Sequence, residues 1–175
     1  MDNSRLYKIT ALANEYCNAL QQTYAMEKEE FLATMTNILP RIYWEFSDYS
    51  PEEMEGATVS LEEESAEFFP SYVDEDFYES IRRGVETLLG PEDTFLETFE
   101  EDMKYSDTPI AASISESLAD IFQPLYNFVS IVRESAGDSI EEAYSECHSD
   151  FRAYWSQTLC NVLRPINHLR YHNAE

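Results

Sequence analysis

The sequence predicts an all-α fold, a single-domain bundle of five or six mostly antiparallel helices. Apolar side chains recur at steps of three and four along most of the chain, the spacing of amphipathic helices. Only four glycines and seven prolines in 175 residues leave little turn punctuation for an all-β fold. A hydrophobic fraction of 43% and an aromatic fraction of 14% indicate a packed core. Residues 1–175 are the size of one domain.

Two amphipathic helices are predicted first, over residues 3–24 and 27–46. The first carries its apolar face from Leu6 to Tyr24, and the second from Phe31 to Phe46. Pro40 lies inside the second helix and removes one hydrogen bond of its ladder, so we expect it to kink or split that helix.

The acidic connecting segment 48–73 loses the helical period. It contains Pro51, Gly56 and Pro70, several glutamates, and no lysine or arginine. A structureless connection of this length is unusual in a compact domain, so the segment is either a functional lid or carries a short helix of its own. Ser60 to Phe68 is the candidate for that helix, because Ser60 and Glu63 have capping-box spacing.

The helical period resumes over residues 74–89, and Gly90 ends this element. Pro91 is then expected to open another helix that extends to Met103. Next comes the stretch around which the bundle is organised, a predicted helix from Thr108 to Glu134 with Thr108 as N-cap and Pro109 at the first helical position.

This central helix is expected to end at Gly137 and to form a hairpin with a last helix over residues 138–169. Pro124 predicts a kink in the central helix. Ser139 and Glu142 predict a capping box at the start of the last one.

The charge distribution limits the classes of partner. The formal net charge is −24, so direct binding to nucleic acid or to anionic membranes is not expected. Residues 42–103 hold 20 acids and two arginines, a net charge of −18. Residues 151–175 hold three arginines and one acid. The acidic, aromatic middle of the chain therefore predicts binding to a basic protein partner.

Cysteine usage and hydropathy predict a cytoplasmic protein. Cys17, Cys147 and Cys160 lack CxxC spacing and fall near apolar helix positions, which favours buried free thiols. Residues 1–16 show no cleavable signal pattern, and no run of about 18 apolar residues predicts a membrane span.

One pattern points to metal chemistry. Glu63, Glu64 and Glu67 have the EExxE spacing found in all-helical nucleotide pyrophosphohydrolases, where carboxylates one turn apart hold Mg²⁺ or Mn²⁺ against a phosphate chain. Glu116 and Asp120 would complete such a site, although their spacing is ExxxD where those enzymes have ExxD. A solvated charged face is the ordinary explanation of Glu116 and Asp120.

Two histidine patterns are weaker. His168 and His172, at i and i+4, have the spacing of a metal chelate but lie in the last eight residues, so we interpret them as terminal polar residues. Cys147 beside His148 does not predict a nucleophile, because adjacent helical residues point in different directions. No P-loop, GxGxxG, GxSxG, HExxH or zinc pattern occurs, so no catalytic residue is assigned.

Two blocks of sequence carry a family resemblance. The first block consists of Tyr105-Ser106-Asp107, Pro109, Ala112-Ser113-Ile114-Ser115-Glu116 and Leu118-Ala119-Asp120-Ile121. The second block consists of Leu88-Leu89-Gly90 with Asp93, Leu96-Glu97 and Phe99. Together they resemble a bacterial family known only as a domain of unknown function. The resemblance implies a soluble bacterial helical protein without assigned chemistry. It draws attention to one possible polar site: Tyr105, Asp107, Ser113, Ser115, Glu116 and Asp120.

Two functions follow as hypotheses. The first is a non-enzymatic cytoplasmic interaction or regulatory protein that presents an acidic surface to a basic protein. The alternative is a divalent-metal-dependent phosphohydrolase. A third interpretation, that the acidity only keeps an abundant protein in solution, stays open. The sequence specifies neither the partner nor the oligomeric state.

Overall fold

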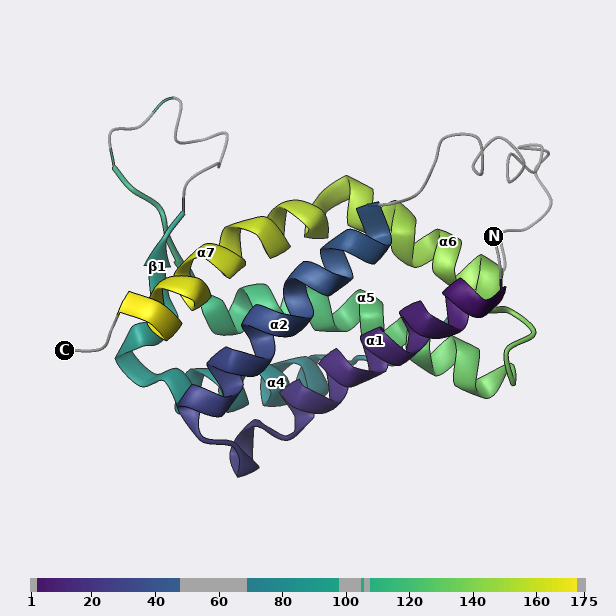
Figure 1. Ribbon diagram of the computed structural model, residues 1–175, viewed down its shortest axis with the longest axis horizontal. Helices are drawn as coiled ribbons and strands as arrows, with labels where there is room; N and C mark the ends of the chain where they lie inside the picture. The colour runs from purple at the N-terminus through teal and green to yellow at the C-terminus, as the bar shows by residue number, and fades with distance from the viewer. Residues whose placement is uncertain (1–2, 48–68, 98–104, 106–107, 173–175) are drawn as a thin grey trace.

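The computed structural model of the protein describes residues 3–47, 69–97, 105 and 108–172. The predicted all-α bundle is confirmed (Figure 1). Its helices are α1 (Asn3–Gln21), α2 (Lys28–Ser47), α4 (Glu75–Leu89), α5 (Ile114–Glu134), α6 (Ile140–Asp150) and α7 (Ser156–His172). The chain also forms two short 3-10 helices, η1 (Thr23–Ala25) and η2 (Gly90–Asp93), and a ribbon of β1 (Thr94–Leu96) and β2 (Ala111–Ser113).

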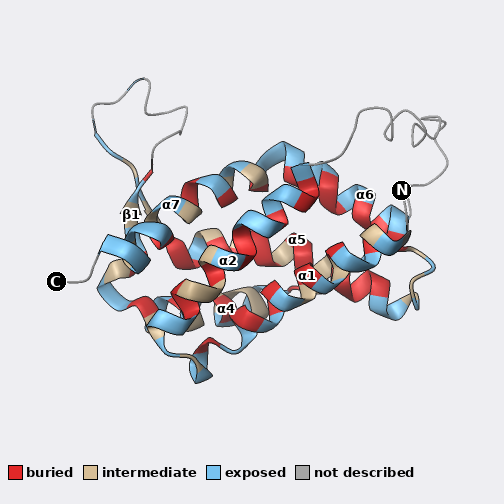
Figure 2. Ribbon diagram, in the orientation of Figure 1, coloured by how far each residue is buried: buried red, intermediate tan, exposed pale blue. Residues whose placement is uncertain are grey.

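Helix α5 is the central helix of the bundle. It packs against α1, α4, α6 and α7, and buried side chains occupy most of its circumference. Figure 2 shows buried surface concentrated where the helices face one another and exposed surface on their outer sides. Even the polar side chain of Ser130 on α5 is buried. The core is therefore built around α5, as its apolar content predicts.

The predicted hairpin of the last two long helices is present. The chain reverses at Ala136 and Gly137, both with positive φ, and α6 and α7 then run back along α5 (Figure 1). The single helix expected over residues 138–169 is instead α6 and α7, joined by a π-helical segment, Phe151–Trp155. Ser139 is the N-cap of α6, but its side chain makes no capping hydrogen bond, so the predicted capping box is wrong.

Helix α4 agrees closely with the sequence. Asp74 caps it by accepting a hydrogen bond from the Phe77 amide at 2.8 Å. Gly90 ends it with a positive φ of 57°. Both signals are local, which is why the sequence specifies these bounds well.

The region between α4 and α5 differs most from the sequence prediction. Pro91 opens the short η2 rather than a helix to Met103, and the chain then extends as β1. Strand β2 occupies the residues expected to form the first turn of α5. The two strands pair antiparallel, with Thr94 opposite Ser113 and Leu96 opposite Ala111. Thr108 is therefore not the N-cap of α5, which starts one residue after Ser113.

Several smaller predictions also need correction. Helix α2 continues through Pro40, so of the two outcomes expected there, a kink or a split, the split is excluded. Helix α1 ends before Tyr24, which is 87% exposed in η1 rather than part of the apolar face. Cys17 and Cys147 are buried free thiols as predicted, but Cys160 is exposed. The short helix proposed for Ser60–Phe68 lies outside the described residues, as do Phe99 and Met103.

None of the helices in the described ranges combines the length and the apolarity that crossing a bilayer requires.

Candidate functional site

The start of α5 holds three of the residues in the predicted polar site, Ser113, Ser115 and Glu116. The side chain of Ser113 caps the helix by accepting a hydrogen bond from the Glu116 amide at 3.2 Å. The backbone amide and the hydroxyl of Ser115 both donate to the buried carboxylate of Asp93, at 2.7 Å and 2.6 Å. A carboxylate at a helix N-terminus is favoured by the helix dipole. Ser113 and Ser115 therefore fix the junction between η2 and α5.

Asp120 lies just over one turn further along α5, in a separate contact. Its carboxylate accepts a hydrogen bond of 2.7 Å from the Tyr78 hydroxyl on α4. Burial raises the pKa of Asp120, the Tyr78 bond opposes that rise, and nearby Glu116 adds to it. The pKa of Tyr78 is raised as well, by burial and by this carboxylate. The pair joins α4 to α5 across a half-buried contact.

Of the remaining members of the predicted site, Glu116 influences this pair through its charge. Glu116 is exposed on the first turn of α5. Tyr105 is 90% exposed. Asp107 lies outside the described residues. The structure thus brings Ser113, Ser115 and the Glu116 backbone together and leaves the side chains of Tyr105 and Asp120 elsewhere.

The structure describes two of the five carboxylates in the alternative metal hypothesis. Glu63, Glu64 and Glu67 lie outside the described residues, while Glu116 and Asp120 are placed as above. Within the described ranges, no three histidine, cysteine, aspartate or glutamate side chains come close enough to hold a metal ion.

Cys147 and His148 belong to the core. The imidazole Nε2 of His148 lies 3.1 Å from the Phe46 carbonyl, which can only accept, so Nε2 carries the proton. Burial lowers the pKa of His148, and burial raises the pKa of the Cys147 thiol well above its ordinary value. A protonated thiol is a poor nucleophile. His148 stacks among the aromatic rings of Phe46, Tyr144 and Phe151.

Sequence reasoning missed a row of acids on α6. Glu142, Glu146 and Asp150 follow one another at four-residue steps and are exposed; we call them the α6 ridge. No lysine or arginine in the described part of the chain forms an ion pair with them. Burial and the proximity of Asp150 raise the pKa of Glu146, and burial raises that of Asp150. The four-residue spacing was the signal in the sequence.

Glu146 and Asp150 border a small hollow between α5, α6 and the chain before α4. Its volume is about 40 Å³, and its apolar lining includes Phe69, Pro124 and Phe128. Tyr154 follows at the end of the ridge, half-exposed, where burial and Asp150 raise the pKa of Tyr154 to about 12. The hollow is far smaller than the pockets that hold metabolites, which measure roughly 300–1,000 Å³.

His168 and His172 occupy the last two turns of α7. Both are exposed, and their rings stack with centroids 5.5 Å apart. Both line a larger groove beside β1.

Comparison with known proteins identifies the family. A family model described as a domain of unknown function (DUF5063) matches residues 3–172, and the chain belongs to this family. The fold is similar to the crystal structure of protein BF1032 from Bacteroides fragilis, with a TM-score of 0.77 and 23% sequence identity over 97% of this chain and 94% of that one. The search among curated proteins found no match.

Proposed function

We propose that this member of a domain-of-unknown-function family is a non-enzymatic interaction protein that binds a basic protein partner through the α6 ridge. The observation that carries the proposal is the ridge itself. Like charges at i and i+4 destabilise a helix by about 0.2–0.5 kcal/mol per pair, so a row of three is unfavourable in the isolated protein. Lysine or arginine side chains of a partner would relieve that repulsion.

The ionisation behaviour of the ridge supports a cationic ligand. The raised pKa values of Glu146 and Asp150 reflect carboxylates that are partly withdrawn from water without a compensating positive charge. A guanidinium or ammonium group placed between them would favour both ionised forms. It would also replace the lost hydration with charge-assisted hydrogen bonds.

The surroundings of the ridge support a protein rather than a free cation. The hollow beside Glu146 and Asp150 has apolar walls and room for part of a side chain. Exposed Tyr154 offers an aromatic surface at one end of the ridge. Acidic steering groups next to aromatic contact area are the combination that protein interfaces use.

Other exposed acids have a structural explanation and make a weaker case. Asp74, Glu75 and Asp76 stand at the N-terminus of α4, and Glu29 and Glu30 stand in the first turn of α2. There the helix dipole favours negative charge. Glu146 and Asp150 stand beyond the first turn of α6 and gain no such stabilisation.

The three free cysteines support a cytoplasmic setting for this interaction, since thiols persist in a reducing compartment.

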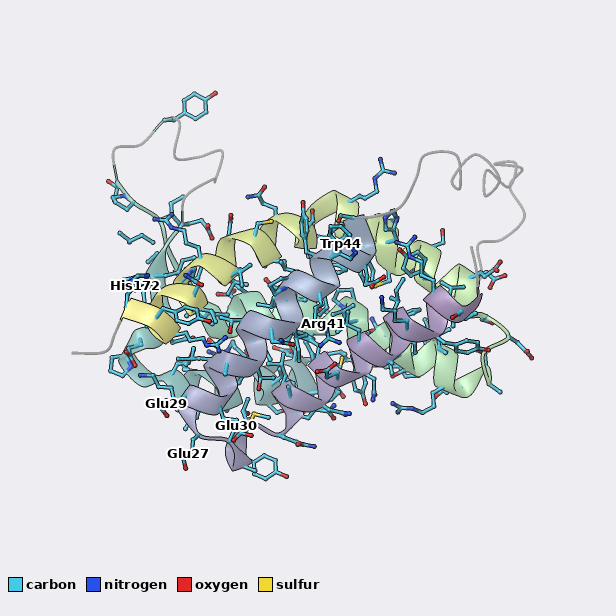
Figure 3. All side chains as sticks on the ribbon, in the orientation of Figure 1. Glu27, Glu29, Glu30, Arg41, Trp44 and His172 are labelled. Carbon is cyan, nitrogen blue, oxygen red and sulfur yellow. The ribbon has the colours of Figure 1, made fainter. Side chains whose placement is uncertain are left out.

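Affinity capture with paired variants tests the proposal. Three proteins are immobilised and exposed to lysate of the source organism at low salt. They are the wild type, the ridge variant Glu146→Gln/Asp150→Asn and the control variant Glu29→Gln/Glu30→Gln. Both variants remove two negative charges, and the control lies at the other end of the molecule, where Glu29 and Glu30 are labelled in Figure 3. Wild type and control should retain the same basic protein, and the ridge variant should lose it.

Salt supplies the second readout. Raising the salt to about 0.5 M shortens the Debye length and should release the partner from wild type. Retention by the ridge variant, or capture that is insensitive to salt, contradicts the proposal. Failure of wild type to capture any basic protein also contradicts it.

A further inference from the structure

A groove at the opposite end of the bundle from the α6 ridge has a different character. It lies where the last turns of α7 pass the ribbon, close to the labelled β1 in Figure 1 and to His172 in Figure 3. Its volume is about 440 Å³. The lining residues are Phe95, Leu96, Asn161, Arg164, Pro165, Asn167, His168 and His172. The volume falls within the range of roughly 300–1,000 Å³ that small-molecule sites occupy.

None of the described residues that line the groove carries a carboxylate. The chain has 35 acids among 175 residues, yet none of the eight lining residues is acidic. Arg164, His168 and His172 stand at four-residue steps and so share one face of α7. Arg164 forms no ion pair within the described part of the structure. A guanidinium in this groove is available to an external anion.

The rest of the lining is apolar or carries a carboxamide group. Leu96 is 61% exposed, and Phe95 and Pro165 are half-buried. Asn161 is only 9% exposed, and its carboxamide oxygen accepts a hydrogen bond of 2.9 Å from Gln157. Its amide N–H groups serve no other described residue. The groove thus combines an apolar wall with a basic edge.

We infer that this groove binds a small organic anion, a carboxylate carried on an aromatic or branched hydrocarbon body. The fork of Arg164 matches the geometry of a carboxylate, which it can bind through two parallel hydrogen bonds. The hydrocarbon body would cover Phe95, Leu96 and Pro165, and removing this apolar surface from water adds affinity. Inorganic phosphate could contact the basic edge but has no hydrocarbon body to cover the apolar wall.

A transition metal is the competing ligand, because two imidazoles at i and i+4 can chelate one. Arg164 stands one turn before His168, and its positive charge opposes a second cation there. In the described ranges no third histidine, cysteine or carboxylate joins the pair. The charge of the groove favours the anion.

Titration followed by amide NMR shifts tests the inference at about 0.15 M salt, where the net charge of the chain is screened. The probes are benzoate, phenylacetate and isovalerate, with neutral benzamide as the matched uncharged probe. At least one carboxylate should give saturable shifts at Leu96, Asn161, Arg164 and His168, and benzamide should bind at least tenfold more weakly than benzoate.

Two variants of equal charge sharpen the test. Arg164→Gln should weaken carboxylate binding at least tenfold. Arg133→Gln should leave it unchanged, because Arg133 is exposed near the end of α5 and does not line the groove.

Four outcomes would overturn the inference: no carboxylate binds; benzamide binds as well as benzoate; Arg164→Gln binds as tightly as wild type; or inorganic phosphate matches the best carboxylate. Shifts at His168 and His172 with Zn²⁺, in the absence of any with carboxylates, would identify a metal site instead.

Discussion

Asp93 in η2 and Ser115 in the first turn of the central helix are joined by two buried hydrogen bonds. One carboxylate oxygen accepts from the Ser115 amide at 2.7 Å and the other from its hydroxyl at 2.6 Å, with both residues buried. The contact joins residues 22 positions apart and holds η2 against the first turn of α5. It explains why a charged side chain is tolerated in the core.

Removing the serine hydroxyl should therefore be costly. Ser115→Ala leaves one oxygen of a buried carboxylate without its donor, so we expect a loss of about 1.5–3 kcal/mol in the free energy of unfolding. Urea denaturation measures it. The control is Ser80→Ala on the exposed side of α4, expected to change stability by less than about 0.5 kcal/mol. Equal midpoints for the two variants would show that the Asp93 contact contributes little.

Acid should destabilise the protein through His148. Because burial lowers the native pKa of His148, the unfolded chain takes up a proton near pH 6.5 while the native state does not. The stability that comes from keeping His148 neutral in the core is fully present above about pH 6.5 and declines as the pH falls toward 5. His148→Gln keeps an N–H donor for the Phe46 carbonyl and cannot titrate, so its stability should fall less between pH 7 and pH 5. His168→Gln, on an exposed histidine, should behave as wild type.

Neutralising the α6 ridge should stabilise the isolated protein. The raised pKa values of Glu146 and Asp150 mean that the native state binds protons more readily than the unfolded chain, so ionisation costs stability. The penalty is complete at pH 7 and absent below the ordinary carboxyl pKa values near 4. Glu146→Gln/Asp150→Asn should gain about 0.5 kcal/mol at pH 7, allowing for solvent screening.

That gain should shrink as the pH approaches 4, which thermal unfolding across this range would show. A variant less stable than wild type at pH 7 would indicate that the ridge carboxylates make stabilising contacts.

Gly84 should resist the usual helix-stabilising substitution. A Cβ at this position of α4 would lie 2.5 Å from the hydroxyl oxygen of buried Thr23 in η1. Gly84→Ala should therefore cost about 1–3 kcal/mol despite the better helix propensity of alanine. In a Thr23→Ala background the same substitution should be neutral or gain up to about 1 kcal/mol. A double-mutant cycle by urea denaturation measures the coupling, and additive effects would argue against the close approach.

The sequence predicts elements well where the signal is local. Asp74 and Gly90 bound α4 because a cap and a glycine with positive φ act within one turn. The prediction from sequence was wrong between Pro91 and Ser113, where Thr108-Pro109 has the composition of a helix start. Pairing of β1 with β2 joins residues 15 to 19 positions apart, and this non-local hydrogen bonding overrides the local preference.

The candidate sites were predictable to a lesser degree. The sequence predicts Asp120 as part of a polar site, but its partner Tyr78 lies on another helix, and no residue spacing in the sequence relates the two. For Asp93, which accepts hydrogen bonds from Ser115, the only indication in the sequence is its place in the second block of the family resemblance. The α6 ridge was visible as a four-residue repeat, yet its lack of cation partners depends on tertiary placement.

The central position of α5 has a consequence for the order of folding. The buried Tyr16 hydroxyl of α1 donates to the Leu118 carbonyl of α5, 102 positions later, and His148 contacts Phe46 across the same separation. Contacts this distant in the chain form slowly, because a long loop must close before they contribute. During synthesis the face of α1 that packs on α5 is covered only once α5 has left the ribosome, and the face of α2 that packs on α7 only once α7 has. A chain arrested before Ile114 lacks both of these partner helices.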